Sequence, residues 1–114
     1  MIEGKGMSLS LHNCQIDITN NREELCKFLK DIVTLAKMNG LGPSHIVKGA
    51  AHLPGLTGVQ IIETSHIALH CFSKNTSYMF NIESCKDFNE NRLKIYILQK
   101  FKPKTYRINA LYTI

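Results

Sequence analysis

The chain has 114 residues, of which 44% are hydrophobic and 20% charged, as is ordinary for a single globular domain. Its net charge of +5 would suit a nucleic-acid partner, but much of the positive charge gathers at one predicted helix end and in the strand after it, where a solvated face is the simpler interpretation. No apolar run is long enough to span a bilayer and the first residues lack an apolar signal segment, so the sequence favours a cytoplasmic protein without a membrane partner.

The first part of the chain predicts a strand followed by a helix. Residues 1–6 are interpreted as a loose leader, and residues 7–114 as a single domain. Apolar residues alternate over residues 7–18, as in a strand. Asn20, followed by Glu23, predicts a helix start, and apolar residues then recur at helical spacing until Asn39 and Gly40.

The rest of the chain predicts five strands and one more helix. Four strands are expected at residues 45–53, 59–63, 65–72 and 77–83, and a last one at residues 105–113. The segment Ser84–Asp87 matches a capping pattern, which predicts a second helix that ends before Pro103. Two helices cannot cover both faces of a parallel sheet. The sequence therefore predicts an α+β two-layer sandwich, with an antiparallel sheet and both helices on one face.

Three segments carry reactive side chains. Pro54–Gly58 predicts a tight turn that holds the Thr57 hydroxyl between glycines. Glu63–Cys71 (ETSHIALHC) places hydroxyls, imidazoles and a thiol in an otherwise apolar strand. In the third segment, Cys85 stands beside Lys86 at a predicted helix start, where the dipole and the cation would both favour the thiolate. Together these groups supply a nucleophile and two proton carriers.

Structural interpretations of the same residues remain open. Strand alternation puts the side chain of Ser65 on the opposite face from His66 and His70. A serine at a strand start is usually a hydrogen-bonded structural residue, the imidazoles could be half-buried sheet residues, and Thr57 could be a turn residue only. The four cysteines are scattered without a Cys-x-x-Cys pair, which favours free thiols. The two imidazoles with Cys71 or Cys85 could suggest zinc, but no ligand pair has the usual short loop spacing, so no metal is expected. Three of the cysteines are expected to be small buried hydrophobes: Cys14, Cys26 and Cys71.

The segment Ser65–His70 (SHIALH), followed by Cys85, resembles the prokaryotic S-adenosylmethionine decarboxylases. The hallmark of that family is Glu-Ser-His, a short apolar stretch and a second His, with a cysteine further along. Thr57 stands where the family has a serine in a small-residue turn. The segment Lys100–Lys104 (KFKPK), which leads into the last predicted strand, is similar to a common family ending. The resemblance covers nearly the whole chain from Met7 onward.

The resemblance implies the fold of that family and a zymogen that cleaves itself. Ser65 would attack the carbonyl of Thr64, the chain would break between them, and Ser65 would become a pyruvoyl cofactor that forms a Schiff base with an amino-acid-type substrate. Thr57 and His70 would assist this processing, and Cys85 would donate a proton to the product carbon. The implied activity belongs to polyamine biosynthesis, leading to spermidine, in a homodimer of cleaved chains, which also suits a domain too small to bury much surface alone.

The chain departs from the family pattern at several positions. Thr64 replaces the family glutamate before the serine, and Glu63 stands one place earlier. Lys74 falls in a segment where the family carries a carboxylate suited to a ribose diol. The substrate is therefore open between S-adenosylmethionine and a smaller amine such as ornithine or arginine. A non-catalytic, uncleaved relative that acts as a binding or regulatory subunit is the alternative. Because the serine, the second histidine and the cysteine are all present, we expect decarboxylation to be retained.

Overall fold

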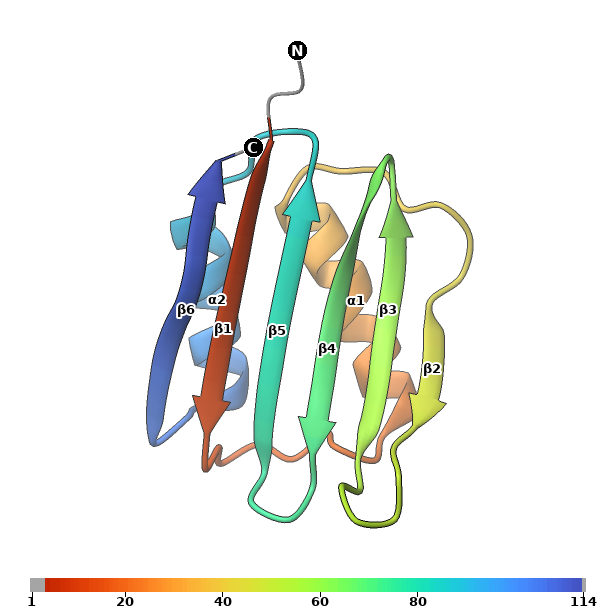
Figure 1. Ribbon diagram of the computed structural model, residues 1–114, viewed down its shortest axis with the longest axis vertical. Helices are drawn as coiled ribbons and strands as arrows, with labels where there is room; N and C mark the ends of the chain where they lie inside the picture. Colours follow the sequence, from red (N-terminus) through yellow and green to blue (C-terminus); the bar gives the residue numbers. More distant parts are fainter. Residues whose placement is uncertain (1–3, 114) are drawn as a thin grey trace.

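The computed structural model describes residues 4–113. Six strands form one sheet in the order β2-β3-β4-β5-β1-β6, with every neighbouring pair antiparallel. Both helices lie behind this sheet in Figure 1, so they cover one of its faces. This arrangement confirms the predicted two-layer α+β sandwich. In chain order the elements are β1 (Lys5–His12), α1 (Arg22–Leu35), β2 (His45–Lys48), β3 (Leu56–Ile62), β4 (Ser65–Phe72), β5 (Ser77–Ser84), α2 (Glu90–Phe101) and β6 (Thr105–Thr113). Within residues 4–113, no helix is long and apolar enough to cross a membrane.

Helix α1 begins with a side-chain cap one residue after the predicted Asn20. Asn21 accepts a hydrogen bond from the backbone N–H of Glu24 at 3.1 Å, which satisfies a donor that the helix itself leaves unpaired. The apolar positions of the helix recur every three or four residues, so they lie on one face and pack against the sheet. Four of them are completely buried: Leu25, Phe28, Leu29 and Ile32.

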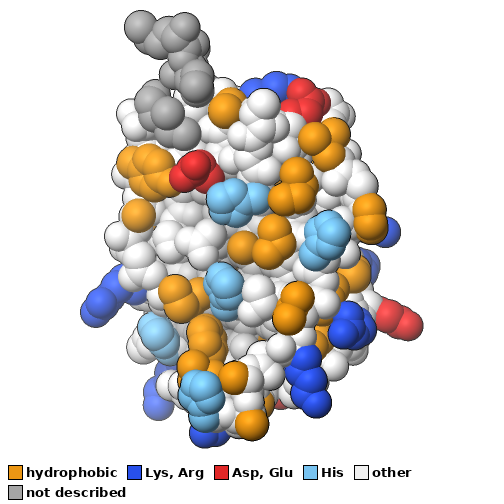
Figure 2. All heavy atoms as spheres, turned by 45° about the vertical axis from the view of Figure 1, so that its right-hand side comes forward, with side chains coloured by type: hydrophobic (Ala, Val, Ile, Leu, Met, Phe, Trp, Pro, Cys, Tyr) orange, Lys and Arg blue, Asp and Glu red, His pale blue; other side chains and the backbone are white. Residues whose placement is uncertain are grey.

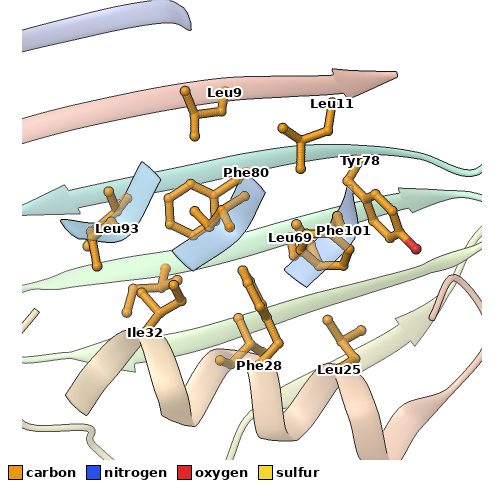
Figure 3. Packing of buried hydrophobic residues seen from close by; sticks show 14 of the residues in the cluster. Leu9, Leu11, Leu25, Phe28, Ile32, Leu69, Tyr78, Phe80, Leu93 and Phe101 are labelled. Atoms are coloured by element: carbon orange, nitrogen blue, oxygen red, sulfur yellow. The ribbon is translucent and has the colours of Figure 1, made fainter. Parts of the chain in front are cut away.

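The hydrophobic core lies between the sheet and the helices, as Figure 3 shows. The ring of Phe28 on α1 meets Phe80 of β5 at 5.9 Å between centroids and Phe101 of α2 at 5.2 Å. The rings of Tyr78 and Phe101 pack in a tilted arrangement with centroids 4.2 Å apart, and the Tyr78 hydroxyl donates to the carbonyl of Ile16 at 2.8 Å. This aromatic cluster joins both helices to the centre of the sheet.

The other face of the sheet, here called the open face, is covered by no element within the described chain. Successive residues of a strand point to opposite faces, so the residues between the buried ones on each strand point to the open face. It carries polar and apolar side chains together, including His45, Thr57, Val59, Ile61, His66, Ala68, His70 and Met79. Figure 2 shows imidazole and apolar side chains side by side on the surface that comes forward there.

Several strand boundaries differ from the prediction. The first strand runs from Lys5 to His12 rather than over residues 7–18, because Asn13 adopts a left-handed conformation with φ 51° and turns the chain. The expected leader therefore loses Lys5 and Gly6 to β1, while its residues 1–3 lie outside the described residues. The second strand ends at Lys48 instead of residue 53, and the third begins at Leu56 instead of residue 59.

The predicted start of the second helix at Ser84 is wrong. Ser84 is the last residue of β5, where it pairs with Lys5 of β1, and this strand pairing overrides the local capping pattern. Helix α2 begins at Glu90, and its cap is Asn89, which accepts from the backbone N–H of Arg92 at 3.0 Å. Cys85 consequently lies in the connection between β5 and α2 and not at a helix start.

Candidate active site at the β3–β4 turn

The predicted cleavage point lies in the hairpin turn between β3 and β4. Ile62 pairs with Ser65, so Glu63 and Thr64 form a two-residue turn. Thr64 has φ 57°, in the left-handed region that a β-branched residue rarely occupies. Its hydroxyl donates to the carbonyl of Glu63 at 2.7 Å. The peptide bond between Thr64 and Ser65 therefore follows directly on a residue with a strained backbone.

The thiol of Cys85 contacts the carbonyl of this peptide bond. Its Sγ donates to the carbonyl oxygen of Thr64 at 3.6 Å, and the side chain is half-buried beside the turn. A donor at this position would stabilise negative charge that develops on the oxygen when a nucleophile attacks the carbonyl carbon. The structure thus brings together three of the residues that the sequence singled out: Thr64, Ser65 and Cys85.

Glu63 is held on both sides of the turn. Its carboxylate accepts from Asn39 Nδ2 at 2.5 Å and lies 3.4 Å from Lys86 Nζ. Its backbone N–H donates to the carbonyl of Asn39 at 3.3 Å. The hydrogen bond from Asn39, and after it the interaction with Lys86, lower the pKa of Glu63 below its ordinary value.

Thr57 and His70 form a second, separate pair. Thr57 lies within β3 and not in a tight turn as predicted, and it pairs directly with His70 of β4 on the open face. The Thr57 Oγ1 lies 3.2 Å from His70 Nδ1. His70 is five residues beyond Ser65 along β4, which corresponds to about 17 Å of strand. Within one chain, the structure does not bring Thr57 and His70 to Ser65.

Ser65 and the two imidazoles lie on opposite faces of β4, as alternation predicted. Ser65 shares the face of the buried Ile67, whereas His66 and His70 point to the open face. Both imidazoles line a shallow cavity of about 270 Å³ there, together with Tyr112. The Tyr112 hydroxyl donates to Glu83 at 2.6 Å, and this hydrogen bond raises the pKa of Tyr112.

A larger cavity of about 410 Å³ lies on the open face near the β4–β5 turn, at the far end of β4 from Ser65. Its apolar lining includes Leu53, Pro54, Phe72 and Met79. Lys74 also lines it and donates to the carbonyl of His52 at 3.2 Å. Within residues 4–113, the lining contains no carboxylate that could accept from a ribose diol.

Two other cysteines are small buried residues, as predicted. Burial raises the pKa of Cys14 to about 11 and, together with the charge of Asp17, that of Cys71 to about 12, so both thiols stay protonated at neutral pH. Cys26, the third predicted to be buried, is only half-buried.

Asn39 and Lys86 are the site residues that the sequence did not single out for their role at the turn. Asn39 was interpreted as a helix stop, and Lys86 as a neighbour that favours the thiolate. Their common partner is Glu63, which is 24 residues from Asn39 and 23 from Lys86 in sequence. The only local sequence feature that could have indicated these contacts was the carboxylate of Glu63 beside the expected cleavage point.

The fold is that of a known class of enzymes. The solved structure of the adenosylmethionine decarboxylase from Aquifex aeolicus matches with a TM-score of 0.78 and 20% identity, over 96% of this chain and 88% of that chain. The family model described as S-adenosylmethionine decarboxylase matches residues 5–112, so the chain belongs to that family. A relative from Archaeoglobus fulgidus, named S-adenosylmethionine decarboxylase proenzyme, is 26% identical over 109 residues, which are 94% of each chain.

Proposed function

We propose that the chain is a self-cleaving decarboxylase that makes its own pyruvoyl group from Ser65. The observation that carries this proposal is the strained Thr64 directly before Ser65, with its carbonyl oxygen on the thiol of Cys85. The name of the archaeal relative, a proenzyme, supports a precursor that is converted to a mature form.

In the proposed processing, Ser65 Oγ attacks the carbonyl carbon of Thr64 while the thiol of Cys85 donates to the carbonyl oxygen. The C–N bond breaks and an ester forms between Thr64 and the side chain of Ser65, with the amine of Ser65 set free. Loss of the Ser65 Cα proton and cleavage of the Cβ–O bond then release Thr64 as a carboxylate. The elimination leaves an enamine at residue 65, which tautomerises to an imine when Cβ takes up a proton. One water molecule hydrolyses the imine, ammonia leaves, and a pyruvoyl group remains at residue 65.

The pyruvoyl group supplies an electrophilic carbonyl that withdraws electrons when carbon dioxide leaves a bound amino acid. This chain's own residues bind the substrate and move protons around it. The thiol of Cys85 contacts the carbonyl of Thr64, the residue directly before Ser65, and so lies close to residue 65 in space. It is therefore the candidate proton donor to the product carbon.

The proposed substrate is S-adenosylmethionine, in cytoplasmic polyamine biosynthesis. Ornithine or arginine is the alternative, because Lys74 stands where the family pattern carries a carboxylate. Lys74 also lines the larger cavity.

The proposed active form is a homodimer, because one chain leaves Thr57 and His70 about 17 Å from Ser65. A second copy placed against the open face can bring its Thr57 and His70 to the β3–β4 turn. Because the Ser65 side chain points to the covered face, a local twist of the turn must then turn its hydroxyl toward them. The second copy would also cover exposed apolar residues such as Ile61, which is 41% exposed, and Val47, which is 63% exposed.

The first experiment is an intact-mass measurement of freshly purified protein under denaturing conditions. We expect two fragments, residues 1–64 and residues 65–114 with a blocked N-terminus, and a single full-length mass for Ser65→Ala. Release of labelled carbon dioxide from carboxyl-labelled S-adenosylmethionine, ornithine and arginine then identifies the substrate.

A full-length mass that persists on incubation would contradict self-cleavage and favour the non-catalytic relative. Cleavage in Ser65→Ala would show that an outside protease cuts the turn. Cleavage without release of carbon dioxide from any of the three amino acids would leave the processing but overturn the proposed substrates.

A further inference from the structure

Three side chains form a connected group around the cleavage turn: Asn39, Glu63 and Lys86, here called the Glu63 clamp. Asn39 and Lys86 reach the same carboxylate from opposite sides of the hairpin. Neither is expected to contact the reacting atoms, because both bind the residue before Thr64. Their effect on the turn must act through Glu63.

The Asn39 side of the clamp is fixed by backbone pairing. Gly40 forms a bridge with Ile62, and the N–H of Leu41 donates to the carbonyl of Ile61 at 2.8 Å. The buried Gln60 then donates to the carbonyl of Gly42 at 3.2 Å. The segment after α1 is thus attached along the end of β3, and Asn39 has a defined position against the turn.

The Lys86 side is fixed by the end of β5. Ser84 is 2% exposed, pairs with Lys5, and accepts from the backbone N–H of Lys86 at 2.9 Å. Between Ser84 and Lys86, Cys85 reaches the carbonyl of Thr64. One short segment therefore contacts two successive turn residues, the carboxylate of Glu63 and the carbonyl of Thr64.

We propose that Asn39 and Lys86 are positioning residues for self-cleavage. Through the carboxylate of Glu63 they hold Thr64 in its left-handed conformation, with its carbonyl on the thiol of Cys85. This inference rests on the proposed function and adds to it the residues that set the rate of processing. The side chains of Lys86 and Glu63 are 57% and 42% exposed, so their ion pair contributes little to global stability. Its loss should alter the turn and the cleavage rate rather than the fold.

The first test measures the conformation of Thr64 in the full chain carrying Ser65→Ala, which cannot process. Nuclear magnetic resonance reports the φ of Thr64 through its H–N–Cα–H coupling and carbon shifts. We expect Thr64 to leave the left-handed region in the double variant Asn39→Ala, Lys86→Met. In Lys86→Arg, which keeps the positive charge, Thr64 should keep its left-handed conformation. The matched control is Lys30→Met on the exposed side of α1. A left-handed Thr64 in the double variant would overturn the proposal.

The second test follows cleavage by intact mass in chains that keep Ser65. We expect the double variant to cleave at least about 10-fold more slowly, because a small displacement of reacting groups has large kinetic effects. Lys86→Arg should restore most of the rate, and Lys30→Met should leave it unchanged. Cleavage of the double variant at the parent rate would overturn the positioning role. A parent chain that never cleaves would overturn the proposed function instead. The first test would then still show whether Asn39 and Lys86 hold Thr64 in its left-handed conformation.

Discussion

Thr64 combines a branched Cβ with a left-handed backbone, two properties that rarely occur in the same residue. Such a conformation costs on the order of 1–3 kcal/mol and persists because the surrounding structure imposes it. Thr76, in the β4–β5 turn, has φ 49° and a similar cost. Strain alone therefore does not define the proposed cleavage site. What distinguishes Thr64 is the hydroxyl that follows it at Ser65 and the thiol of Cys85 on its carbonyl oxygen.

Substitution of Thr64 by glycine can remove the strain while keeping the left-handed conformation, because glycine adopts a left-handed backbone without steric cost. In the Ser65→Ala chain, Thr64→Gly and Thr76→Gly should each raise the free energy of unfolding by about 1 kcal/mol, measured by urea denaturation. In the chain that keeps Ser65, Thr64→Gly should slow cleavage, since the precursor no longer stores strain, and Thr76→Gly should not. Equal cleavage rates in the two variants would show that strain at Thr64 does not assist processing.

At the scale of the elements, the sequence predicts those parts whose pattern is strong and local. Helix α1 and strands β4 and β6 were predicted closely because their apolar spacing is regular over many residues. The start of α2 was not, because the capping pattern at Ser84 competes with strand pairing to Lys5, which is 79 residues earlier in the chain. A local helix-capping pattern does not predict the structure where strand pairing with a distant segment determines the backbone conformation.

The site shows the same division between local and distant signals. Ser65 and Cys85 were singled out from a motif, since their residue types and spacing match the family hallmark. The contact of Cys85 with the Thr64 carbonyl, and the part of Asn39 in holding the turn, depend on how β3, β4 and β5 are brought together. A single sequence gives no spacing rule for such contacts.

The ion pairs between Lys5 on β1 and the carboxylates at the start of α2 give a pH-dependent prediction. Lys5 Nζ lies 2.8 Å from Asp87 and 2.7 Å from Glu90, and these hydrogen bonds lower the pKa of both carboxyls from ordinary values of 3.8 and 4.5. Their stabilisation is therefore present above these ordinary values and lost as the pH falls through the lowered ones. The pKa of Lys5 is raised, first by Asp87, so its contribution is lost in strong alkali only.

Lys5→Met should consequently be less stable than the parent chain at pH 7. The difference in the free energy of unfolding should shrink as the pH falls below about 4, where the carboxyls become protonated. Urea denaturation at pH 7 and pH 3 measures it, with Lys30→Met as the control that should show no such change. A difference of the same size at both pH values would mean that Lys5 stabilises the chain by packing and not by charge.

At the scale of the whole molecule, the sheet has one covered face and one open face, and the motif residues divide between them. Ser65 lies at one end of β4, next to the Thr64 carbonyl that Cys85 contacts, while Thr57 and His70 lie on the open face nearer its other end. An antiparallel arrangement of two sheets, open face to open face, would place Thr57 and His70 of one copy near the β3–β4 turn of the other, where a local twist of the turn would expose the Ser65 hydroxyl to them. In such a dimer, each proposed site would combine Ser65 and Cys85 of one copy with Thr57 and His70 of the other.

Mixed dimers test this arrangement directly. Under the proposed function, Ser65→Ala cannot cleave, and His70→Ala should cleave slowly because it lacks the imidazole proposed to assist proton transfer. When the two variants are produced together, the Ser65 of one chain can meet the intact His70 of the other, so the His70→Ala chain should cleave faster than it does alone. Intact mass distinguishes the fragments of the two chains. The control pairs His70→Ala with the double variant Ser65→Ala, His70→Ala, which offers no imidazole and should give no rescue. If His70 instead serves the serine of its own chain, production with Ser65→Ala will leave the cleavage of His70→Ala unchanged.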